Sequence, residues 1–191
     1  MQAERALVAA RGIHKHYGGI TALAGVSLEV LEGEIHALVR GKAVSPLTPE
    51  KARELGIGAV YQEPSLVPAL TVLDNVFLGS ERRRMMGFLD QRTMSLEARA
   101  ALDKIGARVR LDSEVSGLSV ADRQLVEIAR ALVLKASVLI FDEPSAVLSG
   151  RELARIFDVI RELRQAGLGI LYISHRLAEI FELADRTTVL K

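Results

Sequence analysis

Short runs of consecutive apolar residues alternate with longer amphipathic segments in the second half of the chain. The apolar runs cover residues 138–141 and 169–173, and the amphipathic segments begin near Leu118 and near Ser149. Consecutive apolar residues are typical of strands buried on both faces of a parallel sheet, and apolar residues three and four positions apart are typical of helices. The pattern predicts an α/β fold.

Polar residues of catalytic types follow both apolar runs. Asp142 and Glu143 follow the first run, and Ser174 and His175 follow the second. Open α/β sheets bind ligands at the carboxyl ends of their strands. There, one carboxylate can hold a hydrated Mg²⁺ and the next can polarise a water for attack on a phosphate. A polar turn and a structural histidine are the alternatives, because Asp and Pro are common turn residues.

Short β-type runs also occupy the N-terminal part of the chain. They cover residues 6–9, 23–30 and 34–39, with turn signals at Gly18, Gly19, Glu32 and Gly33. These runs predict an antiparallel layer. Tyr17 precedes two glycines, so we expect it in a loop, where its ring could stack on a flat base. A partly buried surface tyrosine is the alternative.

The residues after Val39 depart from the pattern of a phosphate-binding strand. Such a strand opens into G-x-x-x-x-G-K-S/T and a helix, whose free backbone N–H groups cradle the phosphates. Gly41 and Lys42 match the end of this motif, but Ala43 stands where a hydroxyl is required and the upstream glycine is missing. This segment is therefore not a P-loop.

The middle of the chain predicts a helix, a strand and a helix-rich region. The helix covers Pro49 to Leu55, the strand covers Ile57 to Tyr61, and residues 65–117 include a helix from about Ser95 to Ile105. Gln62 follows the strand. Its amide oxygen could lie near Mg²⁺ or an attacking water, and a polar strand exit is the alternative.

The segment from Leu118 begins with a signal for a helix N-terminus. Ser119 and Asp122 have the spacing of a capping box, and an apolar stripe after them predicts a core helix. A serine hydroxyl at the positive end of a helix dipole can meet an anion as well as its own backbone. Ser149 and Glu152 repeat the capping spacing.

Composition counts against several classes of protein. The chain has 191 residues, with 25 Lys and Arg against 24 Asp and Glu, and it has no cysteine. Such a chain has no net field for nucleic acid or anionic lipid, and it forms neither disulfides nor thiolate metal sites. No apolar run reaches the length of a spanning helix. We expect a soluble chain that meets a membrane through a partner and, because TTVLK ends inside a strand, continues further.

Six ordered motifs resemble those of the ATP-binding subunits of ABC transporters. Tyr17 resembles the A-loop aromatic residue and Gln62 the Q-loop glutamine. LSVADRQ resembles the signature motif, VLIFDEP the Walker B motif with its glutamate, SAVLS the D-loop and YISHRL the H-loop. Within this family, YQEPSLVPALTVLDNVFLG and LSVADRQLVEIARAL are most similar to the first ATPase half of bacterial sugar importers of the ribose, galactose and xylose type.

The chain also departs from the family pattern. Val120 and Ala121 replace two signature glycines, Asp122 replaces a glutamine, and Ser149 replaces the D-loop aspartate. The Walker A motif, its helix and about one following strand are absent. Loss of that helix would expose several apolar side chains worth about 1.5 to 3 kcal/mol each, against a typical domain stability of about 5 to 15 kcal/mol. We therefore expect that the printed sequence omits a segment.

The resemblance implies three sets of site residues in an ATPase that works as a pair of domains. The residues that it implies for catalysis are Glu143, which polarises water, His175, which contacts the γ-phosphate, and Gln62, which senses metal and water. The residues that it implies for Mg²⁺ are Asp142 and Gln62. The residues that it implies for ATP are Tyr17, which stacks on adenine, and Ser119 and Ala121, which serve the nucleotide bound across the dimer.

The resemblance also implies a domain organisation. Residues 1–191 form one ABC-type ATP-binding domain. Its predicted parts are a β-subdomain and the start of the core (1–39), further core that lacks the P-loop (40–62), a helical subdomain (63–117), and core with the signature, Walker B, D-loop and H-loop (118–191). The chain as printed is expected to be inactive, since it lacks the phosphate cradle.

The implied function is to power a membrane permease that imports a sugar. The implied partners are a second ATP-binding domain, fused or in a homodimer, a permease docked through residues 63–80, and indirectly a periplasmic sugar-binding protein, with no nucleic acid. The implied location is peripheral, at the cytoplasmic face of the inner membrane. One alternative is a soluble ABC-type ATPase outside transport, against which the near-zero net charge counts. The other is a catalytically silent domain.

Overall fold

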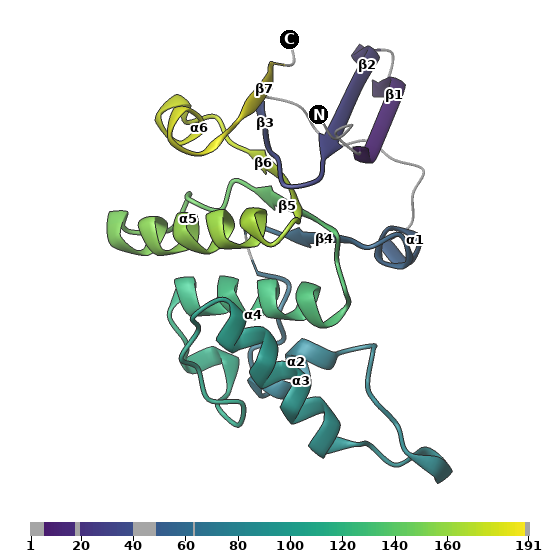
Figure 1. The fold of residues 1–191 in the computed structure, drawn as a ribbon, viewed down its shortest axis with the longest axis vertical. Coiled ribbons are helices and arrows are strands. Elements are labelled where there is room, and N and C mark those ends of the chain that lie inside the picture. The colour runs from purple at the N-terminus through teal and green to yellow at the C-terminus, as the bar shows by residue number, and fades with distance from the viewer. Residues whose placement is uncertain (1–5, 18–19, 40–48, 63, 190–191) are drawn as a thin grey trace. The chain divides into compact units, whose positions relative to one another are not determined.

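The computed structural model describes residues 6–17, 20–39, 49–62 and 64–189 and has the predicted α/β fold (Figure 1). The strands are β1 (Ala6–Tyr17), β2 (Ile20–Leu31), β3 (Ile35–Val39), β4 (Ile57–Val60), β5 (Val138–Asp142), β6 (Gly169–Ile173) and β7 (Arg186–Val189). The α-helices are α1 (Pro49–Glu54), α2 (Val72–Phe77), α3 (Gln91–Lys104), α4 (Val120–Val133), α5 (Gly150–Gln165) and α6 (Leu177–Leu183). The 3₁₀ helices are η1 (Met85–Gly87) and η2 (Val115–Gly117).

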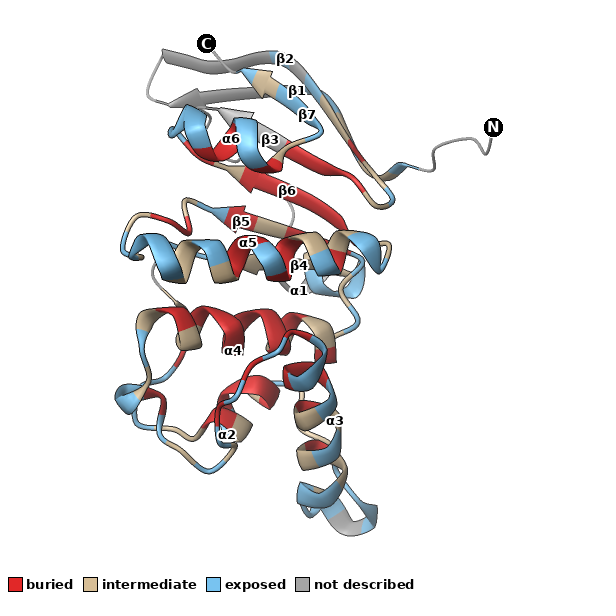
Figure 2. Ribbon diagram, turned by 60° about the vertical axis from the view of Figure 1, so that its left-hand side comes forward, coloured by how far each residue is buried: buried red, intermediate tan, exposed pale blue. Residues whose placement is uncertain are grey.

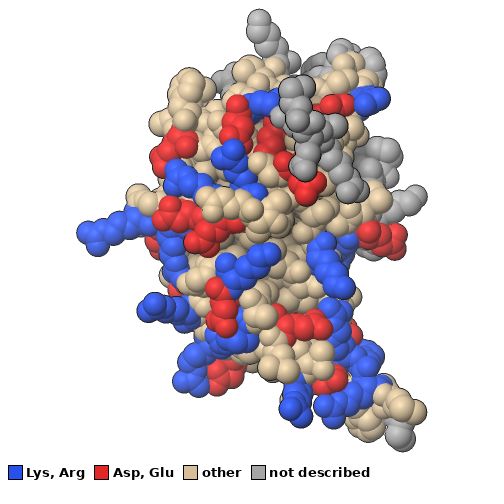
Figure 3. All heavy atoms as spheres, in the orientation of Figure 1, with Lys and Arg blue, Asp and Glu red and all other residues tan. Residues whose placement is uncertain are grey.

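The chain divides into two compact units. The first unit comprises residues 1–59, 137–143 and 163–191, and the second comprises residues 60–136 and 144–162. No helix among the described residues is both long enough and apolar enough to cross a bilayer. Basic and acidic side chains are interspersed on the face drawn in Figure 3, in keeping with the near balance of their numbers.

A five-stranded sheet with the order β4-β5-β6-β3-β7 forms the main layer. The pairs β5–β6, β6–β3 and β3–β7 are parallel. Parallel neighbours require crossover connections, and the helices α5 and α6 follow β5 and β6 in the chain. Because all these strands run the same way, the residues that follow β5 and β6 meet at one edge of the sheet.

One face of this sheet is packed against a hairpin of β1 and β2, which pair antiparallel as predicted. The third run expected in that antiparallel layer, residues 34–39, forms β3 instead, which pairs in parallel with β6 and β7. A core cluster joins Val30 of β2 to Val138 and Leu171 of the parallel sheet. Gly169 is needed at this contact. A Cβ atom there would lie 3.0 Å from Val30 Cγ1 and 3.2 Å from the backbone oxygen of Leu31, so a larger residue would require the hairpin to shift slightly away from β6.

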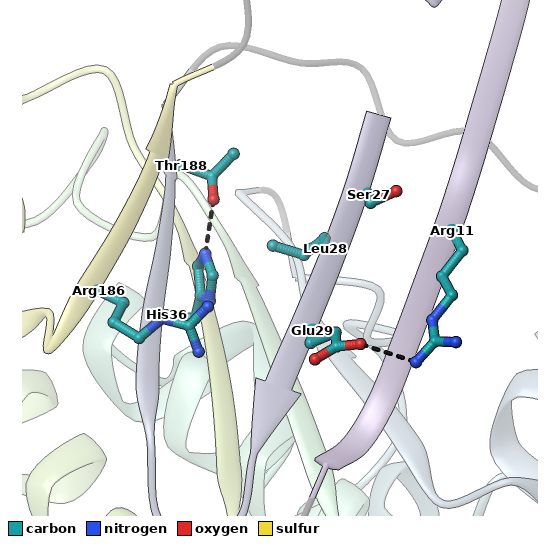
Figure 4. Close-up of a pocket in the computed structure, with 7 residues that line it drawn as sticks. All are labelled: Arg11, Ser27, Leu28, Glu29, His36, Arg186 and Thr188. Atoms are coloured by element: carbon teal, nitrogen blue, oxygen red, sulfur yellow. Dashed lines mark hydrogen bonds and ion pairs between the residues drawn. The ribbon is translucent and has the colours of Figure 1, made fainter. Parts of the chain in front are cut away.

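The hairpin leaves part of the sheet less well covered. Ile140 and Ile173 on the hairpin side are only half-buried, whereas Phe141 and Tyr172 on the other face are fully buried (Figure 2). An open pocket of about 340 Å³ lies within the first unit, between the hairpin and the β3–β7 pair (Figure 4). Its lining includes His36, whose pKa is lowered chiefly by burial. Both observations indicate that the described residues cover this face of the sheet incompletely.

The second unit is built from helices around α4. Its buried residues include Leu125, Val126, Ile128 and Ala129, and α2 and α3 pack against it. Asn75 of α2 is fully buried and holds the preceding loop, because its amide bonds both the N–H (2.7 Å) and the oxygen (3.0 Å) of Val67.

Several predicted boundaries are wrong. The helix expected to reach Leu55 ends at Glu54, and the runs expected at residues 6–9 and 23–30 extend to Ala6–Tyr17 and Ile20–Leu31. The helix expected from Ser95 begins at Gln91, because Asp90 caps it by accepting a hydrogen bond from the Thr93 N–H. The strand expected to reach Tyr61 ends at Val60. Tyr17, expected in a loop, is the last residue of β1 and pairs with Ile20, because pairing in the hairpin continues to both sides of residues 18 and 19.

Candidate functional site

The two apolar runs form neighbouring strands, and their polar ends come together as predicted. Asp142, the last residue of β5, pairs in register with Ile173, the last residue of β6. Glu143 therefore lies beside the segment that carries Ser174 and His175. Within the first unit, this edge gathers one histidine and two carboxylates at the carboxyl ends of parallel strands, where α/β proteins bind their ligands.

Glu143 has a backbone conformation that is unusual for a residue with a side chain. Its φ angle is +46°, in the left-handed region that costs an L-residue roughly 1 to 2 kcal/mol. Its N–H donates to the Ile173 oxygen at 2.9 Å, and this bond helps to hold the strained residue against β6. Such backbone strain is concentrated at functional sites.

Glu143 and His175 form a direct pair. The distance between His175 Nδ1 and Glu143 Oε1 is 3.0 Å, with the side chains 60% and 34% exposed respectively. An ionised carboxylate only accepts hydrogen bonds, so Nδ1 carries the proton in this pair and Nε2 is left to face an incoming ligand. The pair can thus orient a water and contact a negatively charged group from adjacent positions.

Asp142 stands next to this pair and is suited to a hydrated divalent cation. Partial burial, and secondarily the Glu143 carboxylate, raise the pKa of Asp142, so a cation here would relieve repulsion between the two acids. Mg²⁺ usually keeps several waters and takes one or two protein carboxylates together with substrate phosphates. In the part of the chain that the structure describes, no three His, Asp or Glu side chains are grouped to hold a metal.

A buried acid fixes the segment that leads to His175. Glu179 of α6 accepts hydrogen bonds from the Tyr172 and Ser174 hydroxyls, both at 2.9 Å. The Ser174 hydroxyl in turn accepts from the Arg176 N–H at 3.0 Å. Residues on both sides of His175 are therefore held, while its own ring stays exposed.

The N-terminus of α4 has the predicted capping box. The Ser119 hydroxyl accepts from the Asp122 N–H at 3.1 Å and lies 2.9 Å from Asp122 Oδ2. Arg155 of α5 donates to Asp122 Oδ1 at 3.1 Å. Ser119 is exposed, whereas Ala121 is 2% exposed, so of these two predicted residues only Ser119 presents its side chain at the surface of the second unit.

Gln62 is exposed in a bend directly after β4. The residues beside it are bound to Glu127 of α4, which accepts from the Tyr61 N–H and from Ser65. Gln62 thus follows a strand end, as predicted. Residues before and after it are held by a side chain of α4, a helix far along the chain.

The predicted site residues are divided between the two units. Those in the first unit are Tyr17, Asp142, Glu143 and His175, and those in the second are Gln62, Ser119 and Ala121. The structure brings Glu143 and His175 into contact. The side chain of Tyr17 and the segment with Gly41, Lys42 and Ala43 lie outside the described residues.

Three buried polar residues near these sites are not apparent as site residues from the sequence. They are Gln124, Glu127 and Glu179, each at most 5% exposed. Gln124 Nε2 donates to the Pro144 oxygen at 2.9 Å and so connects α4 to the residue after the strained glutamate. The sequence signal that could identify such residues is a polar residue within the apolar stripe of a helix, because a buried polar side chain needs a hydrogen-bond partner.

Comparison with known proteins gives one matching family and many relatives. Residues 20–146 match the family model described as ABC transporter. The chain is 39% identical over 212 residues to the ribose import ATP-binding protein RbsA of Rhodococcus jostii, covering 97% of this chain and 42% of that protein. It is 41% identical over 214 residues to RbsA 1 of Rubrobacter xylanophilus, covering 98% and 43%. The chain thus spans about two fifths of the length of these relatives.

Solved structures with the same fold are more distant in sequence. CbiO1 of Clostridium perfringens, part of the ABC transporter complex cbiONQ, has a TM-score of 0.80 at 23% identity, covering 98% of this chain and 86% of that one. The dimeric bacterial ABC transporter cassette MJ0796 has a TM-score of 0.74 at 22% identity, covering 95% and 93%. These similarities establish the fold.

The alignment with the Rhodococcus protein is longer than this chain. It extends over 212 residues, whereas the chain has 191, so at least 21 residues of the relative have no counterpart here. The length difference is in keeping with the expectation that a segment is missing, and the position of that segment after Val39 stays a prediction.

Proposed function

Because the chain belongs to the ABC transporter family, we propose that it is the ATP-binding and hydrolysing domain of a sugar importer, with its P-loop segment absent. The observation that carries this proposal is the contact between His175 and Glu143, at the ends of two adjacent parallel strands and directly after Asp142. The ribose import proteins that align over nearly the whole chain support a sugar of that class as the cargo.

In the proposed mechanism, the first unit supplies the groups that act on the γ-phosphate. Glu143 polarises the attacking water, and His175 holds Glu143 through Nδ1 and contacts the γ-phosphate through Nε2. Asp142 would hold the hydrated Mg²⁺. When bound, this ion neutralises charge on the phosphates.

The second unit supplies the remaining contacts. Gln62 would place its amide oxygen near the metal and the water, while Ser119 and Ala121 would serve the ATP held by a second ATP-binding domain. Support comes from the exposed Ser119 hydroxyl at the start of α4, where the helix dipole favours an anion. Tyr17 stacks on adenine from the end of β1.

Only some of residues 63–80 are available for the proposed contact with a permease. Leu66 and Val72 are buried, at 9% and 0% exposure, and belong to the core of the second unit. The exposed residues among those described are Ser65, the run from Val67 to Ala69, Asp74 and Gly79, and the contact is proposed at Ser65 and the run from Val67 to Ala69. Through this surface the domain would lie at the cytoplasmic face of the inner membrane, with a periplasmic sugar-binding protein reached only indirectly.

The chain of 191 residues, without an inserted P-loop segment, is proposed to bind ATP weakly and to hydrolyse none. Base stacking on Tyr17 provides about 1 to 3 kcal/mol, and millimolar affinity already requires about 4 kcal/mol. Without Mg²⁺, Asp142 and Glu143 repel phosphate. Intact mass shows whether a preparation has the printed 20.8 kDa, and micromolar affinity for Mg-ATP in such a preparation would contradict this proposal.

The catalytic assignment is tested in the chain with the missing segment of a ribose import relative inserted after Val39. We expect this protein to hydrolyse ATP and its Glu143→Gln variant to bind ATP but to hydrolyse it far more slowly, because only the carboxylate polarises water. Glu162→Gln, on the exposed surface of α5, is the matched control. Equal single-turnover rates for Glu143→Gln and this control would disprove the role of Glu143.

A further inference from the structure

Glu127 is a buried acid for which the proposed mechanism has no use. It is 3% exposed and lies in α4 between fully buried residues, Leu125 and Val126 before it and Ile128 and Ala129 after it. Burial raises the pKa of Glu127, against the effect of its hydrogen bonds. A carboxyl group in such surroundings is unfavourable unless its oxygens are well supplied with donors.

Among the described residues, the hydrogen-bond donors to Glu127 come from the segment around Gln62. Glu127 Oε1 accepts from the Ser65 N–H at 2.5 Å and from the Ser65 hydroxyl at 2.9 Å, and Oε2 accepts from the Tyr61 N–H at 3.3 Å. Both oxygens are used, one at each end of residues 61–65. The single acid thus closes a short loop whose second residue is Gln62.

Only a carboxylate can make these contacts with both of its oxygens. The side chain of Gln has one acceptor oxygen, and its NH₂ group would place a donor against a backbone donor at one end of the loop. An apolar residue of similar size would fill the helix surface but would bind neither end. The choice of Glu at position 127 is therefore explained by the loop rather than by the packing of α4.

We propose that Glu127 is a positioning residue for Gln62. It ties the bend that presents Gln62 to the helix whose first turn presents Ser119, so that these two residues keep a fixed separation within the second unit. The proposal rests on the proposed function in giving Gln62 and Ser119 their roles. The positional link itself does not need nucleotide.

The chain offers a direct test because it has no cysteine. A nitroxide label is attached to a single Gln62→Cys or, as a reference, to Val67→Cys, whose backbone is held by Asn75 instead. Each label is introduced into the natural chain, into Glu127→Gln and into Glu162→Gln. We expect the spectrum at position 62 to become mobile in Glu127→Gln only, with position 67 unchanged.

Amide hydrogen exchange provides the second measurement. The Tyr61 and Ser65 amides should exchange at least about tenfold faster in Glu127→Gln, since hydrogen bonds to charged groups are among the stronger ones, while the Val67 amide keeps its rate. If Glu127→Gln does not fold, Ser65→Ala removes one donor and should mobilise position 62 partially. An unchanged label at position 62, or equal loosening at positions 62 and 67, would overturn the proposal. Neither outcome depends on ATP hydrolysis.

Discussion

Replacing Gly169 with alanine tests whether the β1–β2 hairpin packs directly on the parallel sheet. The new Cβ atom would lie 3.0 Å from Val30 Cγ1, 3.1 Å from Leu7 Cδ1 and 3.2 Å from the Leu31 oxygen. The two methyl groups end flexible side chains and can turn away. The Leu31 oxygen belongs to the backbone of β2, so relief of that contact requires the hairpin itself to move.

Two opposing effects set the expected magnitude. Overpacking of a well-packed core costs about 1 to 3 kcal/mol, whereas Gly→Ala stabilises by about 0.4 to 1 kcal/mol through the unfolded chain. Gly169 does not have a positive φ angle, so backbone strain adds nothing. We expect a net loss of about 1 to 2 kcal/mol, which for a chain of this size lowers Tm by about 2 to 8 °C.

Urea denaturation followed by circular dichroism measures this loss. Gly117→Ala is the matched control, because a Cβ atom there meets nothing within 4 Å and its φ angle is not positive. The control should be neutral or slightly stabilising. If Gly169→Ala is as stable as the control, the hairpin does not rest on β6, and the reasoning about the uncovered sheet face fails.

Three further predictions follow from local contacts. Ser119→Ala should lower the free energy of unfolding by about 1 kcal/mol through loss of the N-cap, measured by urea denaturation; no change would mean that α4 needs no cap. Burial raises the pKa of Glu127 in the folded chain, and the hydrogen bonds from Ser65 and Tyr61 offset only part of this shift. Forming the carboxylate therefore costs more in the folded than in the unfolded chain, and the free energy of unfolding should fall as the pH rises from the ordinary glutamate pKa through the raised value. Glu127→Gln should remove this slope from the pH dependence of unfolding, and an identical slope would refute the assignment. A crosslinker placed at Ser65 or Pro68 should capture a co-expressed permease, and an assembled complex without any crosslink would exclude docking there.

The sequence was sufficient to predict the strand edge and both capping boxes. The edge is predictable because continuous apolar runs are typical of parallel strands buried on both faces, and the polar residues that follow such strands lie at the edge of the sheet. The boxes at Ser119 and Ser149 are predictable because their hydrogen bonds join residues three positions apart. Local chemistry decides both features.

The features that the sequence did not predict depend on residues distant in the chain. Glu127 meets its donors 62 and 66 positions earlier, and Tyr17 was expected in a loop because pairing with Ile20 cannot be read from single-residue preferences. In each case the partner, not the residue, determines the conformation. A charged residue inside an apolar helical stripe is nevertheless a usable signal, since burial without partners would be prohibitive.

The geometry of the catalytic edge is set by the sheet and not by a ligand. Glu143 is held in a left-handed conformation by its bond to the Ile173 oxygen, and His175 is oriented by Glu143 and by the buried hydroxyls that Glu179 holds beside it. All of these contacts lie within the first unit and involve no residue of the missing segment. The pair of Glu143 and His175 is thus formed without a P-loop. Under the proposed function, inserting the P-loop segment should therefore supply affinity for phosphate without having to build the pair that acts on it.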